Sequence, residues 1–247
     1  MPTHLLLLGA SLSSLSHLQL SPGEAVQSLT SLPFTTLLAD ADQLDEATTT
    51  ALQKRRISAI ARVNAFSEES IARLSALSDQ VKLHSINIQF PAEGAAPSLL
   101  EFAADQRIPV TVSLPDTLDW TTDFTLPELQ ERPSYLLDLN SLAWGSPLLP
   151  ASLPKLEHII GHTDFAAGHL HESANHSPAL LLTEIMRRWR TSRPVGSSFL
   201  FFPEAPPASE TTIDETLTSL RAQWEIAKTN WKQASAAGRD PVWPSSE

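Results

Sequence analysis

Short apolar runs recur along the chain, and each is followed by a turn signal and then by a segment with helical spacing of its apolar residues. This alternation is typical of a parallel β-sheet covered by helices. Successive runs begin 23 to 30 residues apart, except for a last gap of 39 residues. The eight predicted strands begin near His4, Phe34, Ile57, Lys82, Ile108, Ser134, His158 and Ser197. This spacing predicts an α/β fold, a single (β/α)8 TIM barrel with an enlarged loop after the seventh strand.

The predicted helix starts agree with this alternation. Residues 21–24, Ser-Pro-Gly-Glu, combine a capping residue, a proline in the first turn and a capping-box glutamate. Ser67 precedes apolar residues with helical spacing. Ser177, followed by Pro178, precedes another such run. Thr212 and Glu215 form a second capping box before an apolar stripe that continues to Trp231. This pattern predicts a long C-terminal helix that braces the barrel wall.

The remaining segments set the expected domain limits. Residues 91–97, between two prolines, are expected to form a loop after the fourth strand. Residues 116–132 have only a short helical pattern, so the fifth helix is expected to be vestigial. No polar linker interrupts the barrel, which is expected to occupy residues 1–235, with a C-terminal tail at 236–247.

Composition narrows the classes of partner. The formal net charge is −11, from 17 Lys and Arg against 28 Asp and Glu, which disfavours nucleic acid as a partner. There is no cysteine, so disulfides and thiolate chemistry are excluded, and any metal must be bound by nitrogen and oxygen ligands. The apolar run at residues 5–8 is too short for a signal peptide, and no run approaches the ~20 residues of a membrane span. We therefore expect a cytoplasmic protein with a small-molecule substrate and no membrane partner; a homodimer is one possible assembly.

Polar residues follow the later predicted strands at their carboxyl ends. In a parallel barrel these ends meet at one mouth, where active sites lie. The fifth to eighth strands present Asp116, Asp138, His162 and Glu204 there. Three carboxylates and an imidazole suit a divalent metal ion (Mn, Mg, Fe or Zn) with open positions for substrate oxygens.

The enlarged loop after the seventh strand is rich in histidine. Five of the eight histidines lie between His158 and His176. His169 and His171 alternate on an extended segment, so they are expected to point the same way. The further candidate substrate-binding residues are Asp164, Glu172, Asn64 and Trp144. A solvent-exposed histidine pair without function is the alternative for His169 and His171.

The order of acids and histidine on the last four strands resembles that of the xylose isomerase-like barrel superfamily. That superfamily includes sugar isomerases, ketose 3-epimerases, hydroxypyruvate isomerase and nucleases of the endonuclease IV type. Its sixth strand closes with Asp-x-x-His, which residues 138–141 match at Asp138. Its seventh strand carries a histidine followed by an acid and a glycine-containing loop, matched by His162, Asp164 and residues 168–172. The resemblance implies a metal-dependent isomerase or epimerase of carbohydrate metabolism.

The sequence also departs from that pattern. The fifth strand ends Leu-Pro-Asp where the superfamily has Leu-Glu, so Asp116 stands one position late. Ser141 replaces the histidine after the sixth strand. Asp40 and Asn64 stand where the nuclease branch would place histidines, which makes a three-zinc nuclease site improbable.

Three hypotheses follow for the function. The first is a divalent-metal-dependent isomerase or epimerase of a small sugar or hydroxy-ketone, acting through an enediolate, with Glu204 and Asp116 as the acid/base pair. In it, His169 or His171 positions a hydroxyl or phosphate of the substrate. The second is a degenerate barrel that has lost its metal and binds a metabolite or a partner protein without turnover. The third is a metal-dependent oxidase or hydrolase that uses the histidine loop.

Overall fold

The computed structural model describes most of the N-terminal half of the chain and the elements that close the sheet. The described residues are 4–94, 96–113, 134–138, 156–161, 196–203 and 212–236, with helical pieces at 182–183, 186–187 and 189–190.

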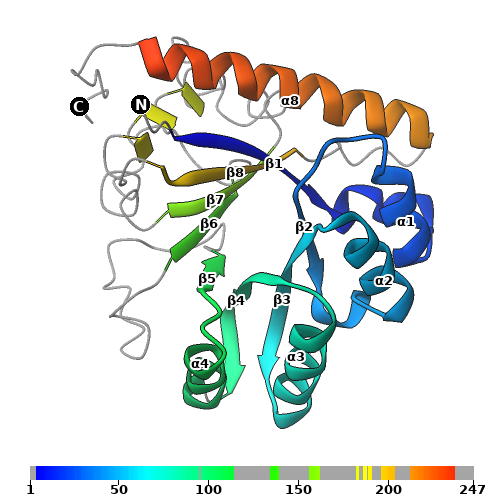
Figure 1. Cartoon of the computed structure of the whole chain (residues 1–247), viewed down its shortest axis with the longest axis vertical. Helices are drawn as coiled ribbons and strands as arrows, with labels where there is room; N and C mark the ends of the chain where they lie inside the picture. The colour runs from blue at the N-terminus through cyan, green and yellow to red at the C-terminus, as the bar shows by residue number, and fades with distance from the viewer. Residues whose placement is uncertain are drawn as a thin grey trace.

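Eight parallel strands form the sheet. Each begins within two residues of its predicted start, so all eight predicted strands are confirmed. Their bounds are β1 Leu5–Ser11, β2 Thr36–Asp40, β3 Ser58–Phe66, β4 Leu83–Gly94, β5 Val110–Ser113, β6 Ser134–Asp138, β7 Leu156–Gly161 and β8 Ser198–Pro203. Neighbours in the chain pair with each other, and β8 pairs with β1, so the sheet closes in the order β1 to β8. The predicted α/β fold with a parallel barrel sheet is confirmed (Figure 1).

Helices connect the strands of the first half. They are α1 Pro22–Leu29, α2 Glu46–Arg55, α3 Glu68–Gln80 and α4 Ala96–Asp105, with 3-10 turns η1 Leu12–Leu18 and η2 Ala41–Gln43, and α8 Ile213–Ala236 follows β8. The Ser21 hydroxyl accepts from the Glu24 amide, and the Glu24 carboxylate accepts from the Ser21 amide, which is the predicted capping box. Thr212 and Glu215 make the same pair of bonds at the start of α8. The predicted long C-terminal helix is therefore confirmed.

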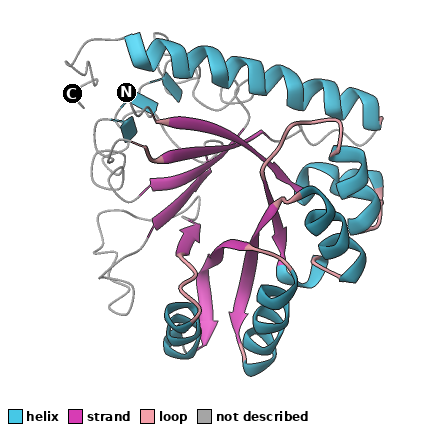
Figure 2. Ribbon diagram, viewed as in Figure 1, coloured by secondary structure: helices cyan, strands magenta, loops and turns pink. Residues whose placement is uncertain are grey.

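The helices lie outside the sheet, and α8 crosses the barrel wall over β1 and β8 (Figures 1 and 2). One apolar cluster fills the space between the strands of the first half and their helices. It includes Leu37 and Ala39 of β2, Leu52 of α2 and Leu74 of α3, each at most 3% exposed. The odd-numbered residues of β2 thus face the helices.

A second apolar cluster fills the inside of the barrel. Leu38, Ile60, Leu200 and Phe202, from β2, β3 and β8, are all fully buried in it. Gly9 of β1 makes this packing possible, because a β-carbon at residue 9 would overlap the ring of Phe202. Since side chains alternate along a strand, residues 40 and 62 fall on the same inner face, two positions nearer the carboxyl ends.

The predicted loop at residues 91–97 is wrong. Strand β4 continues to Gly94, and α4 begins at Ala96. After an irregularity at Val63, Ala65 of β3 pairs with Glu93, so the neighbouring strand keeps this segment extended.

Other parts of the sequence-based description stay predictions. The vestigial fifth helix lies outside the described residues. Of the tail predicted at 236–247, Ala236 is the last residue of α8, and residues 237–247 lie outside the described residues. Of the helix predicted after Ser177, Leu182, Met186 and Trp189 are helical and buried as expected. The division into a barrel at 1–235 and a tail is not tested. No helix in the described part of the chain is long and apolar enough to cross a membrane.

Candidate functional site at the carboxyl ends of the strands

Two of the ten predicted site residues, Asp138 and Asn64, lie in the described part of the chain. Asp138 is the last residue of β6, as predicted, and Asn64 is exposed on β3. The others lie outside the described residues: Asp116, Trp144, His162, Asp164, His169, His171, Glu172 and Glu204. Their roles stay predictions.

The register of the last three strands bears on the predicted metal ligands. Asp138 pairs with Ile160, and Gly161 pairs with Pro203. His162 and Glu204 are the next residues after Gly161 and Pro203 in the sequence. Three adjacent strands thus end together, each at or one residue before a predicted ligand.

Polar residues occupy a continuous row on the other side of the barrel. Asp40 of β2 pairs in register with Arg62 of β3, Arg62 with Asn87 of β4, and Asn87 with Thr111 of β5. Arg62 and Asn87 are flanked along their strands by residues that pack against the helices: Ala61 and Val63 beside Arg62, and Ile86 and Ile88 beside Asn87. The row therefore faces the barrel interior, directly above the apolar cluster of Leu38 and Ile60.

Arg62 and Asp40 form an ion pair at this mouth. The Nη1 atom of Arg62 lies 3.7 Å from Oδ1 of Asp40, and the side chains are 18% and 36% exposed. That distance exceeds a normal N–H···O hydrogen bond. The Nε of Arg62 and the Oδ1 of Asp40 are both buried and make no hydrogen bond in the described part of the chain. The two charges attract each other without satisfying each other's hydrogen-bonding groups.

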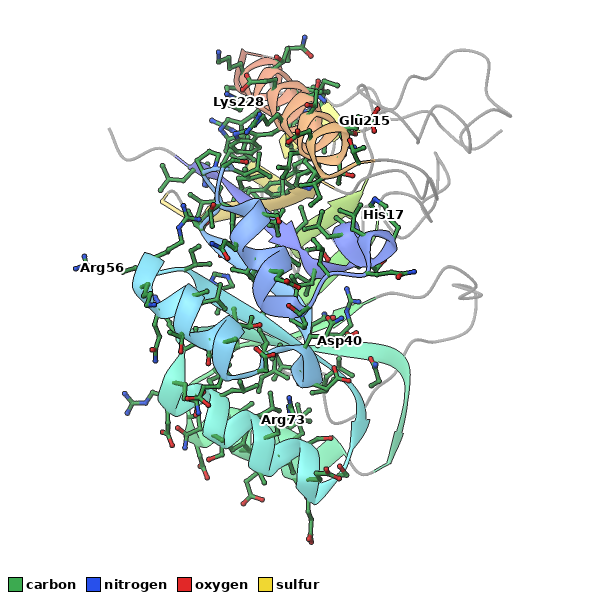
Figure 3. All side chains as sticks on the ribbon, turned by 90° about the vertical axis from the view of Figure 1, so that its right-hand side faces the viewer. His17, Asp40, Arg56, Arg73, Glu215 and Lys228 are labelled. Carbon is green, nitrogen blue, oxygen red and sulfur yellow. The ribbon has the colours of Figure 1, made fainter. Side chains whose placement is uncertain are left out.

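Hydrogen bonds with Gln43 and Arg73 fix the backbone around Asp40. The Asp40 amide donates to Oε1 of Gln43 at 3.1 Å. Arg73 of α3 donates through Nε to the carbonyl of Ala41 at 2.6 Å, and through Nη2 to the carbonyl of Asp42 at 2.8 Å. Figure 3 shows Asp40 at the end of its strand, with Arg73 on the helix beneath it. These bonds position the carboxylate of Asp40 at the rim.

Asn87 and Thr111 continue the row as a satisfied pair. Both are fully buried, and Nδ2 of Asn87 donates to Oγ1 of Thr111 at 3.1 Å. The Thr111 hydroxyl donates to the carbonyl of Ile86 at 3.4 Å. This pair is part of the packed interior, in contrast to the partly exposed Arg62.

The described residues contain no group of three His, Asp or Glu side chains that could hold a metal ion. Whether the chain can bind a metal ion therefore depends on the predicted ligands at the ends of β6, β7 and β8. The donors predicted there, two carboxylates and an imidazole, are chemically suited to a divalent cation, and the register brings the three strand ends together.

Among the described residues, the carboxyl groups whose pKa values are shifted lie at helix starts. The pKa of Asp45 is lowered because its carboxylate accepts a hydrogen bond from the Thr48 amide. Hydrogen bonds from Ser21 lower the pKa of Glu24, and hydrogen bonds from Thr212 lower that of Glu215. These shifts belong to helix capping.

Sequence reasoning did not single out Arg62 as a functional candidate. A signal was present, because an arginine interrupts the apolar run of residues 57–63 at a position that alternation places inside the barrel. A charged side chain there needs a partner or a ligand.

No protein-family model matches the sequence, and no curated protein matches it. Solved structures do match over nearly the whole chain. A xylose isomerase domain protein from Alicyclobacillus acidocaldarius has a TM-score of 0.57 at 11% identity, covering 93% of this chain and 99% of that one. A xylose isomerase domain-containing protein from Salmonella typhimurium has a TM-score of 0.56 at 11% identity, covering 90% and 97%. D-allulose 3-epimerase from a Methylomonas species, in complex with D-allulose, has a TM-score of 0.54 at 12% identity, covering 96% and 98%.

The fold is therefore that of xylose isomerase-like TIM barrels, as the sequence resemblance implied. At 11 to 12% identity these matches concern the fold.

Proposed function

We propose that the chain is a divalent-metal-dependent isomerase or epimerase of a small sugar or hydroxy-ketone. The single observation that carries the proposal is the register of β6, β7 and β8, which ends three adjacent strands at Asp138, Gly161 and Pro203. The structural match to a D-allulose 3-epimerase supports the same substrate class.

In this proposal Asp138, His162 and Glu204 hold the metal, with Asp116 or water completing the ligand set. A bound divalent ion would polarise the substrate carbonyl and make the neighbouring C–H bond more acidic. Glu204 or Asp116 then removes the proton from that carbon, and a carboxylate on the opposite face returns one. Asn64, Asp164, His169, His171, Glu172 and Trp144 would contact the substrate.

The proposal is tested by elemental analysis and by a ketose assay. Protein purified without added metal should contain close to one equivalent of a divalent metal, and it should interconvert D-fructose and D-allulose. Asp138→Ala should lose both properties. Asp214→Ala is the matched control, since Asp214 is exposed in the first turn of α8.

The two main hypotheses predict different results. A wild-type protein that takes up no metal and converts no ketose would favour the non-catalytic barrel that binds a metabolite or partner. Turnover that survives Asp138→Ala would remove Asp138 from the site.

A further inference from the structure

The guanidinium of Arg62 is a positively charged group at the carboxyl-end mouth. It has no hydrogen bond in the part of the chain that the structure describes. An arginine side chain carries five N–H donors in a fixed fork, and it remains protonated in proteins. No hydrogen bond reaches any of them within the described part of the chain, and Nε is buried. Its ionic contact there is Asp40, at 3.7 Å.

The surroundings make this arrangement costly without a ligand. Fully buried Ile60 lies two residues below Arg62 on the same face. Burying an N–H donor without a partner destabilises the folded chain, because the donor loses its hydrogen bond to water. A ligand with two coplanar or neighbouring anionic oxygens, a carboxylate or a phosphate, would match the fork.

We infer that Arg62 binds an anionic group of the substrate, so that the substrate of the proposed isomerase or epimerase is an acidic ketose, carrying a carboxylate or a phosphate. This inference rests on the proposed function and adds the substrate class to it. Arg62 acts as a binding residue, and Asp40 orients its guanidinium from the rim.

The ring order fixes where on the substrate the anion lies. In the order β1 to β8, strand β3 is four strands from β7, so the two lie on opposite sides of the barrel. Arg62 belongs to β3, and the proposed metal ligand His162 follows β7. A ligand that reaches both must span the mouth. The anionic group therefore lies at the end of the molecule remote from the reacting carbonyl.

Three ketoses that differ only at C6 test the inference: D-fructose, D-fructose 6-phosphate and D-fructuronate. Their affinities for the full chain, supplied with Mn²⁺, are measured by calorimetry. At least one of the two anionic ketoses should bind about tenfold to a hundredfold more tightly than D-fructose. The tighter of the two identifies phosphate or carboxylate as the anion.

Substitutions at the ion pair separate binding from structure. Arg62→Met should abolish the preference for the anionic ketose and leave the affinity for D-fructose unchanged. Arg62→Lys keeps the charge and loses the fork, so it should retain part of the preference. Asp40→Asn keeps a side-chain oxygen that can orient the guanidinium and removes the negative charge that competes with the ligand, so it should strengthen binding of the anionic ketose. A purely structural ion pair predicts that Arg62→Met and Asp40→Asn change binding in the same direction.

Equal affinity for the three ketoses, including no measurable binding of any, overturns the inference. So does an equal loss of affinity for all three in Arg62→Met, provided that its circular dichroism spectrum matches that of the wild type. If the circular dichroism spectrum of Arg62→Met differs from that of the wild type, the other two variants decide. The inference then requires that Arg62→Lys weakens binding of the anionic ketose and that Asp40→Asn strengthens it. Failure of the proposed function appears separately, as an absence of metal uptake and turnover.

Discussion

Gly9 of β1 and Phe202 of β8 lie against each other inside the barrel, and the Phe202 ring fills the space that a β-carbon on residue 9 would need. Phe202 is fully buried together with Leu38, Ile60 and Leu200. The contact forms between the first and last strands, where β8 pairs with β1. The absence of a side chain at residue 9 thus lets a large ring fill the barrel where the sheet closes.

Gly9→Ala should destabilise the protein. Overpacking of a filled core costs about 1 to 3 kcal/mol, and urea denaturation measures the change in the free energy of unfolding. The double variant Gly9→Ala/Phe202→Val should be more stable than the sum of the two single effects predicts, because valine lacks the ring atoms that overlap. Unchanged stability of Gly9→Ala would show that the ring can move aside at no cost.

The strands and the capped helices were predictable because their signals are local. The Ser21 to Glu24 capping box and the box at Thr212 and Glu215 depend on residues three apart, and both form as predicted. The extended segment at 91–94 was missed because its cause is remote: Ala65 of the neighbouring strand pairs with Glu93. A sequence window around Pro91 contains no information about that partner.

The candidate site also has one part that the sequence predicted and one part that depends on contacts between distant residues. Asp138 closes β6 as predicted, because an acid directly after an apolar run is visible in the sequence. The ion pair of Asp40 and Arg62 depends on the register between β2 and β3, which places residues 22 positions apart side by side. Sequence alone gives the inward position of Arg62 but not which carboxylate lies beside it or that the distance between them is too long for a hydrogen bond.

Asp45→Ala should weaken the start of α2. The Asp45 carboxylate accepts a 2.7 Å hydrogen bond from the Thr48 amide, so its removal leaves an amide of the first turn without its cap. The expected loss in the free energy of unfolding is about 1 kcal/mol. Asp42→Ala is the matched control: Asp42 is also exposed, and the contact of its residue with Arg73 uses the backbone carbonyl, which the substitution keeps. An equal effect of both substitutions would argue against the cap.

The effect of the Asp45 cap should depend on pH. The hydrogen bond from Thr48 lowers the pKa of Asp45 in the folded chain below its unfolded value. The unfolded chain therefore binds the proton more readily, and the stabilisation is fully present above the unfolded pKa and is lost as the pH falls through the folded pKa. The stability difference between wild type and Asp45→Ala should be larger at about pH 6 than at about pH 3. A difference that grows in acid would contradict this sign.

His162→Ala and His171→Ala should separate metal binding from substrate binding. His162 follows Gly161, whose strand end lies between those of Asp138 and Pro203, so its imidazole is the proposed nitrogen ligand of the metal. Its loss should lower metal affinity more than about tenfold, since even the groups that only support a ligand contribute that much. His171→Ala should keep the metal and weaken ketose binding, because its proposed contact is with the substrate. Elemental analysis and calorimetry on both variants measure the two properties, and full metal content in His162→Ala would exclude the proposed ligand set.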